Sequence, residues 1–198
     1  MSIKVIGLTG QTGSGKSSVC EYLKGLNFVI IDSDKITRNI HENAACKMEL
    51  IEFFGKEIIN ESGKIDRKVL SQKAFSDDKS LKKLNQIIHP KIIIKIKDLI
   101  LKYKNEAYRG IILDAPLLFE SGVNKLCSDT LAVLSDEKIR LERIIKRDNL
   151  NEESAKIRIS AQNNNEYFIK KADKYILNNN DLNSLFNEIN EVLKEWRI

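Results

Sequence analysis

A glycine-rich segment near the start of the chain has the residues needed to bind the phosphates of a nucleotide. Residues 10–17 read GQTGSGKS and satisfy the pattern G-x-x-x-x-G-K-[ST] at every fixed position. Glycines let successive backbone N–H groups point at one anion, and the start of a following helix adds positive potential. Lys16 is predicted to contact the β- and γ-phosphates, and the Ser17 hydroxyl to bind Mg²⁺. The predicted phosphate-binding residues are Gln11, Thr12, Gly13, Ser14, Gly15, Lys16 and Ser17.

Two classes of protein use such a loop: kinases, and GTPase or ATPase switches. Guanine-specific switches carry N-K-x-D after a strand, and the nearest string here is NKLC at 124–127, with Cys127 in place of the base-reading Asp. Switches also carry D-x-x-G, whereas residues 114–117 read DAPL and lack the glycine. Both switch signatures fail, which favours a kinase.

Two acidic residues follow the second apolar run of the chain. Asp32 and Asp34 come directly after Phe28–Ile31, and the carboxyl ends of parallel strands meet at the edge of a sheet where ligands bind. A carboxylate there can orient an acceptor hydroxyl and take its proton. We predict that Asp34 is this base, with Asp32 as the next candidate. The alternative is that Asp34 only caps a helix starting near Lys35.

Two further polar residues lie at strand ends and are more ambiguous. Asp114 closes the apolar run Ile111–Leu113, a weak signature of a magnesium or substrate contact. Thr9 stands immediately before the glycine-rich loop. Both are kept as candidate substrate-binding residues.

Residues 136–148 suit a helix that carries a row of arginines. At about 100° per residue, Arg140, Arg143 and Arg147 fall on one arc, separate from the apolar arc. Arginines stabilise the charge on a transferring phosphoryl group, and a kinase needs a cationic lid that excludes water. We therefore expect this row of arginines to act in phosphoryl transfer; the alternative is a solvated charged face.

The apolar runs that must position these residues are short and rich in Ile and Val, as buried parallel strands are. Helical segments separate them, which predicts an α/β fold with a parallel five-stranded sheet flanked by helices. The predicted core comprises residues 1–35, 109–135 and 171–198, with a helical insertion at 36–108 and a lid at 136–170. Pro90 is predicted to start a new helix within that insertion. The predicted strands are Ile3–Leu8, Phe28–Ile31, Ile111–Leu113, Thr130–Leu134 and the weaker Tyr175–Leu177.

Composition restricts the class of protein further. The chain has 198 residues with 33 Lys and Arg against 28 Asp and Glu, a net charge of +5 that suits phosphate-bearing ligands. No apolar run approaches the ~18 residues of a membrane span. The three cysteines are widely spaced and the two histidines lie far apart, which argues against a disulfide framework or a zinc site. A cytoplasmic enzyme or switch is expected.

Taken in order along the chain, several strings resemble the dephospho-coenzyme A kinase family, the P-loop kinases that complete coenzyme A synthesis. The phosphate loop is followed by DSD at 32–34 and by His89-Pro90, matching the D-x-D and H-P of that family. LDAPLLFE at 113–120 resembles its D-x-P-L-L-F-E, and RIIKRD at 143–148 its R-x-x-x-R-D, followed by Arg158 and Gln162. ADKYILNN at 172–179 resembles its closing A-D-x-x-I-x-N. The likeness covers nearly the whole chain.

The resemblance implies ATP-dependent phosphorylation of the ribose 3′-hydroxyl of dephospho-CoA, with Mg²⁺, a helical substrate-binding part and a lid. It implies that Asp34 is the base and that Arg143 and Arg147 are catalytic arginines of the lid. It also implies that His89 contacts substrate and that Asn178 lies near the adenine. It also implies a small-molecule substrate, no nucleic-acid or membrane partner, and a monomer or weak homo-oligomer. Alternatives from other classes are another P-loop small-molecule or nucleoside kinase and a non-enzymatic nucleotide-binding module. Departures from the family pattern occur at Thr12, Ser18 and Asn180.

Overall fold

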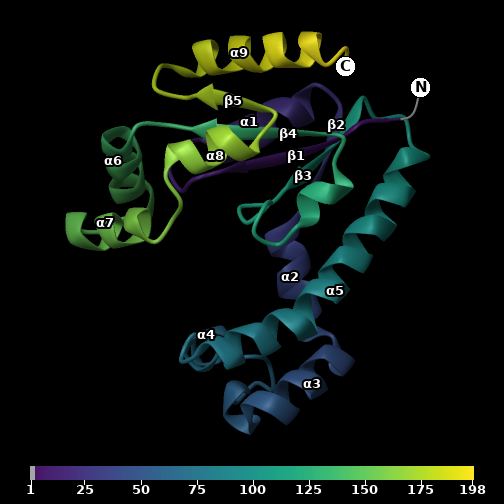
Figure 1. Ribbon diagram of the computed structural model, residues 1–198, viewed down its shortest axis with the longest axis vertical. Coiled ribbons are helices and arrows are strands. Elements are labelled where there is room, and N and C mark those ends of the chain that lie inside the picture. Colours follow the sequence, from purple (N-terminus) through teal and green to yellow (C-terminus); the bar gives the residue numbers. More distant parts are fainter. Residues whose placement is uncertain (1–2) are drawn as a thin grey trace. The chain divides into compact units, whose positions relative to one another are not determined.

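The computed structural model describes residues 3–198 and contains a five-stranded sheet with the order β2-β3-β1-β4-β5 (Figure 1). The pairs β1/β3, β1/β4 and β4/β5 are parallel. All five predicted strands are confirmed, with ends that differ from prediction by at most two residues. They are β1 Val5–Gly10, β2 Phe28–Asp32, β3 Gly110–Asp114, β4 Asp129–Leu134 and β5 Lys174–Leu177.

Helices connect the strands, as a parallel sheet requires. The α-helices are α1 Lys16–Gly25, α2 Ser33–Glu42, α3 Ala44–Phe54, α4 Arg67–Ala74, α5 Asp78–Lys104, α6 Glu137–Asp148, α7 Glu152–Ser160, α8 Asn165–Lys171 and α9 Leu182–Glu195. Two short 3₁₀ helices are η1 Lys56–Ile58 and η2 Val123–Leu126.

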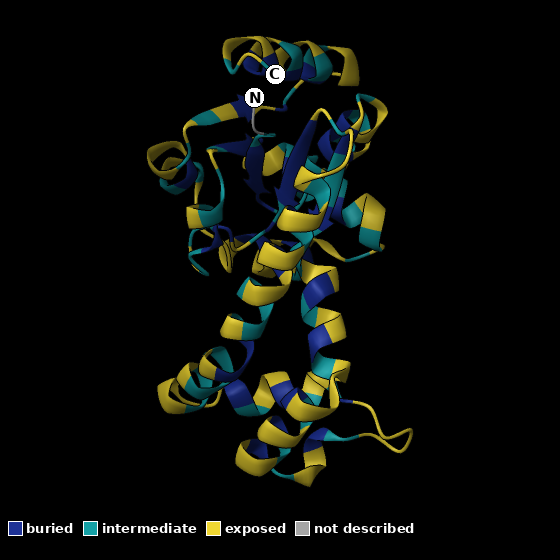
Figure 2. Ribbon diagram, turned by 90° about the vertical axis from the view of Figure 1, so that its right-hand side faces the viewer, coloured by how far each residue is buried: buried dark blue, intermediate teal, exposed yellow. Residues whose placement is uncertain are grey.

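The apolar strands are buried on both faces of the sheet. Leu131 and Val133 of β4 pack with α1 and α9, whereas Ala132 and Leu134 pack with Phe168 of α8. Because alternate strand residues point to opposite faces, α8 covers the face opposite to α1 and α9. The central strands β1, β3 and β4 are almost entirely buried, as the dark blue strands of Figure 2 illustrate, whereas the edge strands β2 and β5 are partly exposed. This double burial explains why β1, β3 and β4 read as continuous apolar runs without alternation.

The chain divides into two compact units. One contains the chain up to Ile31 together with Ile100–Ile198, and the other is Asp32–Leu99. Within the second unit, α3, η1 and α4 pack on each other around buried residues such as Cys46, Leu50 and Leu70. Most of the predicted insertion, residues 36–108, falls in this unit.

The prediction that Pro90 starts a new helix is wrong, because α5 runs without a break from Asp78 to Lys104. Proline lacks the N–H that would bond the carbonyl of residue 86, and its ring crowds the preceding turn. In the same turn, the side chain of Lys91 donates to the Ile87 carbonyl at 3.1 Å. Ile87 and Ile88 are buried, and their packing holds the helix together through the proline.

Candidate active site

The phosphate-binding loop between β1 and α1 is packed so closely that only glycine fits at two positions. Gly13 and Gly15 have φ values of 79° and 95°, in the left-handed region that side chains disfavour. A Cβ on Gly13 would lie 2.8 Å from the backbone oxygen of Arg140, and one on Gly15 would collide with the Asn178 amide. The first N–H groups of α1 have no acceptor within the helix, so they can bind an anion.

Lys16 is the first residue of α1 and forms an ion pair with Asp114, the last residue of β3. The two side chains are only 18% and 17% exposed, so water screens the pair weakly. Asp114 reaches the loop because β3 pairs with β1 in a register that sets it opposite Leu8. Burial, together with the Asp114 charge, raises the pKa of nearby Cys20 to about 12, so this thiol is neutral. A bound phosphate would have to compete with Asp114 for the Lys16 ammonium.

Thr9 and Ser17 occupy opposite ends of the loop. Thr9 is fully buried, and its hydroxyl donates to the Pro116 carbonyl at 3.2 Å, which ties β1 to the segment after β3. Ser17 is exposed in the first turn of α1. Their predicted roles, in substrate and magnesium binding respectively, stay predictions.

Asn178, just after β5, supports the loop from the other side. Its amide Nδ2 donates to the Ser14 carbonyl at 2.7 Å, and the residue is 5% exposed. Nη1 of Arg143 donates to the Asn178 carbonyl at 3.0 Å and approaches the Gly13 carbonyl at 3.4 Å. Arg143 and Asn178 therefore hold the loop against the end of β5. The predicted adenine contact of Asn178 stays a prediction.

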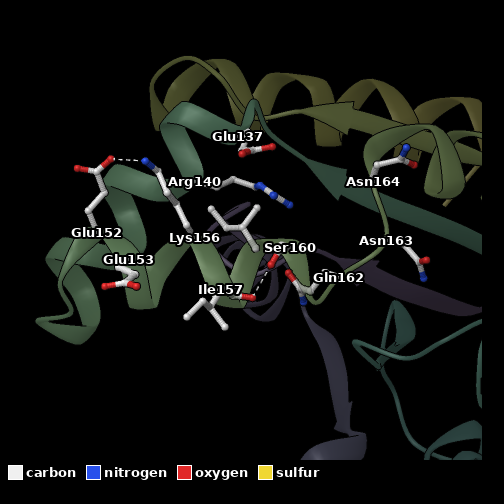
Figure 3. Close-up of a pocket in the computed structure, with 11 residues that line it drawn as sticks. Glu137, Arg140, Glu152, Glu153, Lys156, Ile157, Ser160, Gln162, Asn163 and Asn164 are labelled. Carbon is white, nitrogen blue, oxygen red and sulfur yellow. Dashed lines mark hydrogen bonds and ion pairs between the residues drawn. The ribbon is translucent and has the colours of Figure 1, made fainter.

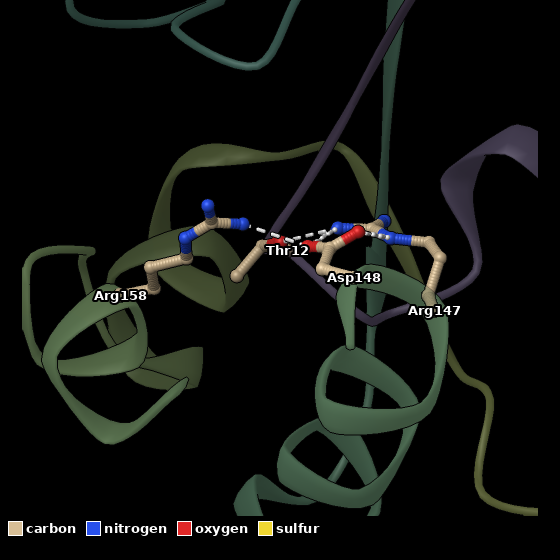
Figure 4. Close-up of polar contacts among 4 residues, drawn as sticks. All are labelled: Thr12, Arg147, Asp148 and Arg158. Atoms are coloured by element: carbon tan, nitrogen blue, oxygen red, sulfur yellow. Dashed lines mark hydrogen bonds and ion pairs between the residues drawn. The ribbon is translucent and has the colours of Figure 1, made fainter. Parts of the chain in front are cut away.

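The Asp148 carboxylate forms ion pairs with two arginines near the loop (Figure 4). Asp148 accepts from Nε and Nη2 of Arg147 at 2.8 and 2.9 Å, and from Nη1 of Arg158 at 2.7 Å. Nη2 of Arg147 also reaches the Thr12 hydroxyl at 3.5 Å. The two guanidinium groups hold the pKa of Asp148 below its ordinary value, so it is ionised. This cluster links α6, α7 and the phosphate loop.

The segment after α7 bonds directly to the first half of the loop. The Thr12 backbone N–H donates to Oε1 of Gln162 at 2.8 Å, and the Gln11 amide donates to the Asn163 carbonyl at 2.9 Å. Our prediction of the site omitted Asp148, Arg158 and Gln162. All three lie in the strings that resemble the kinase family, so the sequence did mark them. Their spacing in the sequence could not show that they contact the loop, because they are more than a hundred residues away from it.

Arg140 departs from the arginine row predicted for this helix. It is 3% exposed and turned away from solvent, whereas the side chains of Arg147 and Arg158 are more than half exposed. Ile144, one turn further along α6, packs against Ala155 of α7. Arg140 lies at the edge of the predicted arc nearest this contact, so helix packing buries it.

The remaining predicted residues belong to the unit Asp32–Leu99. Helix α2 begins at Ser33, and its cap is Asp32, whose carboxylate accepts from the Lys35 N–H at 2.8 Å. The alternative that Asp34 caps the helix is therefore wrong, because the helix starts earlier. Asp34 is exposed in the first turn. Burial lowers the pKa of His89, which lines a cavity beside Pro90 and is neutral at pH 7.

Comparison with known proteins assigns the family. The dephospho-CoA kinase family profile matches residues 4–184. The chain belongs to the dephospho-CoA kinase family. A dephospho-CoA kinase from Fusobacterium nucleatum is 46% identical over 189 residues, which are 96% of each chain. Among solved structures, the dephospho-CoA kinase from Campylobacter jejuni is 30% identical with a TM-score of 0.62, covering 97% of this chain and 96% of that one. A Thermus thermophilus protein is 29% identical with a TM-score of 0.82, covering 98% of both chains.

Membership of this family makes the protein a P-loop kinase and decides against the switch and the non-enzymatic module. ATP is the phosphoryl donor that a kinase of this family implies. Within residues 3–198, no helix is both long and apolar enough to cross a membrane.

Proposed function

We propose that this protein transfers the γ-phosphoryl group of ATP to the ribose 3′-hydroxyl of dephospho-CoA, giving coenzyme A and ADP. The observation that carries this proposal is the family match over residues 4–184 together with an intact phosphate loop in that span. The acceptor oxygen forms a bond to the γ-phosphorus, and the bond from that phosphorus to the β–γ bridging oxygen breaks. The hydroxyl proton leaves to a carboxylate of the protein.

On the donor side, the N–H groups of the loop and the Lys16 ammonium hold the β- and γ-phosphates. Arg147 lies at the loop and can reach the transferring group when Asp148 releases it or turns with it. Arg143 donates to the carbonyls of Gly13 in the loop and Asn178 after β5, so its contribution includes holding the loop as well as supplying charge. Donors fixed in advance stabilise the charge that develops in the transition state.

On the acceptor side, Asp34 is the proposed base. One observation supports it: Asp34 stands in the string that matches the family D-x-D. A carboxylate placed beside the acceptor hydroxyl can accept its proton as the new bond forms.

Mg²⁺ is proposed as the metal. The donors near the loop, the Ser17 hydroxyl and the Asp114 carboxylate, are oxygens, which Mg²⁺ prefers, and few are needed because nucleotide phosphates and water complete its shell. When bound, the ion neutralises charge on the phosphates. Between residues 3 and 198 there is no group of three or more His, Cys, Asp or Glu side chains that could hold a metal by themselves.

The finer organisation is also proposed from the family resemblance. Residues 36–108, including His89, bind the acceptor, residues 136–170 form a lid, and Thr9 and Asp114 contact substrate. Asn178 lies near the adenine of ATP. The protein works in the cytoplasm as a monomer or weak homo-oligomer, on a small-molecule substrate, without a nucleic-acid or membrane partner.

The test is a coupled assay of ADP formation with dephospho-CoA and, in parallel, with shikimate and free nucleosides as acceptors. We expect turnover with dephospho-CoA alone, and phosphorus NMR of the product should place the new phosphate on the 3′-oxygen. Preference for another acceptor would overturn the assignment of substrate.

A further inference from the structure

Helix α6 brings Arg143 and Arg147 to the phosphate loop, so the position of its first turn matters for the site. The cap residue of α6 is Asp136, and in the described part of the chain its side chain makes no capping hydrogen bond. On the side of α6 that lines a cavity of about 840 Å³, Nε and Nη1 of Arg140 are buried without a hydrogen-bond partner within residues 3–198 (Figure 3). The start of the helix therefore depends on polar contacts from another element.

Asn179, the second residue after β5, supplies these contacts. Its side-chain amide meets the Asp136 backbone N–H at 2.9 Å and the Ser135 hydroxyl at 3.0 Å. A backbone N–H can only donate, so the amide atom that it meets is the oxygen, and the Ser135 hydroxyl must donate to the same oxygen. Ser135 is 1% exposed. A hydrogen bond at such a buried position is costly to lose, because water cannot replace the missing partner.

The contacts of Asn179 continue the pairing of β4 with β5 beyond the sheet. The two strands are parallel with Leu134 opposite Leu177, and the Asn178 backbone N–H donates to the Leu134 carbonyl at 2.8 Å. One residue further along, the Asn179 side chain accepts from the chain that leaves β4 and enters α6. The end of β5 thus sets the place at which α6 begins.

Arg143 connects α6 back to the same place. Its Nη1 donates to the Asn178 carbonyl at 3.0 Å, and it lies 3.4 Å from the Gly13 carbonyl and 3.5 Å from the Ser135 hydroxyl. Asn179 therefore holds the start of the helix, and Arg143, two turns later, bonds to the residue next to Asn179. Loss of either side chain should loosen the same junction.

We propose that Asn179 is a positioning residue for phosphoryl transfer, whose amide oxygen fixes the start of α6 and thereby holds the Arg143 guanidinium against the phosphate loop. The inference rests on the proposed function, in which Arg143 both supplies charge and holds the loop. A small displacement of a group that must meet the transition state can lower turnover by orders of magnitude. The same displacement should loosen the loop, because Arg143 approaches the Gly13 carbonyl.

The experiment compares Asn179→Ala with Asn179→Asp in the full-length protein. Asn179→Ala should lower kcat with ATP and dephospho-CoA, and raise the calorimetric Kd for ATP, each by roughly five- to tenfold, as expected for loss of a buried hydrogen bond. Asn179→Asp keeps an acceptor oxygen and should stay within about twofold of the wild type in both. Asn183→Ala is the matched control, an exposed asparagine in the first turn of α9, and should change neither.

A double-mutant cycle with Arg143→Met separates positioning from a purely structural role. In the Arg143→Met background, Asn179→Ala should lower kcat and ATP affinity little further, because the group that it positions is already gone. It should still lower Tm, since the hydrogen bonds to Ser135 and Asp136 are lost in either background.

Three results would overturn the inference. The first is unchanged kinetics and ATP affinity in Asn179→Ala. The second is an Asn179→Asp variant that loses as much as Asn179→Ala, because the oxygen would then not be the group that matters. The third is an equal loss from Asn179→Ala with and without Arg143, which marks a structural role. If the wild type does not phosphorylate dephospho-CoA, the proposed function fails instead, and the ATP affinities of the same cycle still decide the role of Asn179.

Discussion

At the scale of single residues, the site is a set of charges held in place by partners that substrate must displace or share. Lys16 is paired with Asp114, and Arg147 with Asp148. Such pairs keep flexible side chains ordered near the loop before a nucleotide arrives. Substituting a member of such a pair changes both turnover and the free energy of unfolding, and the two effects can be measured separately.

Lys16→Ala should lower kcat by several decades while the protein stays folded. The ammonium contributes charge stabilisation in the transition state, and each decade corresponds to about 1.4 kcal/mol. Steady-state kinetics with ATP and dephospho-CoA measure the loss. Lys24→Ala is the matched control on the same helix, because Lys24 is exposed and pairs only with neighbouring Glu21 among the ion pairs described. A Lys16→Ala variant with more than about a tenth of the wild-type rate would contradict the role of the loop lysine.

Asp34→Asn should lower kcat by roughly two to four decades, the range for loss of a general base, with little change in Tm. Asp32→Ala should do the reverse and lower the free energy of unfolding by about 1 kcal/mol, because it removes the cap of α2. Turnover and thermal unfolding are measured on the same preparations. Near-normal turnover in Asp34→Asn would mean that the base lies elsewhere.

The stabilising effect of Asp148 should depend on pH in a stated direction. Its two arginine partners lower its pKa in the folded protein relative to the unfolded chain. The contribution is therefore fully present above the unfolded pKa of about 3.9 and is lost as pH falls through the lower folded value. The difference in free energy of unfolding between the wild type and Asp148→Asn, measured in urea, should be largest above about pH 4 and should shrink progressively as pH falls further below it. A difference that grows on acidification would contradict the ion-pair geometry.

At the scale of elements, contacts from helix α6 and from the residue that follows β5 fix the conformation of the loop between β1 and α1. Gly13 touches the backbone of α6, Asn178 bonds to Ser14, and Arg143 bridges the two contacts. The loop therefore depends on two elements more than a hundred residues away in the sequence, and a change in backbone shape there should be felt in nucleotide binding.

Gly13→Ala should weaken ATP binding and destabilise the protein, because a Cβ meets the Arg140 carbonyl at 2.8 Å and φ is 79°. Gly25→Ala is the matched control: nothing lies within 4 Å of its Cβ, and its φ is not in the left-handed region. Alanine there should stabilise α1 by about 0.5–1 kcal/mol. Calorimetric binding and chemical unfolding measure both variants. Equal behaviour of the two alanines would show that the loop is not closely packed.

At the scale of the whole molecule, the free cysteines report on the integrity of the folded chain. Cys20 and Cys46 are buried, and burial raises the pKa of Cys127 to about 12. Iodoacetamide reacts with the thiolate, so the native protein at pH 8 should label far more slowly than the urea-unfolded chain. Mass spectrometry over time measures the labelling of each thiol. Rapid labelling of Cys20 in the native protein would indicate local opening next to Lys16.

Much of this site was predictable because its signals are local. The glycine-rich loop, with Lys16 and Ser17, depends on residues adjacent in sequence, and the strands follow from apolar runs that only a doubly covered sheet can bury. The family resemblance likewise rests on short strings in a fixed order. The role proposed for Asp34 came from such a string, and it still awaits its test.

Only the tertiary structure determined the features that depend on residues distant in sequence or on the exact first residue of a helix. The cap of α2 moved to Asp32 because the helix begins two residues before the predicted start near Lys35. Arg140 and Arg143 share an arc by helical period, yet packing of α6 on α7 buries the first while the second bonds to the loop. Helical period gives the direction of a side chain around its own axis. Burial and hydrogen bonding depend on which other element lies in that direction, and residues far apart in sequence supply that element.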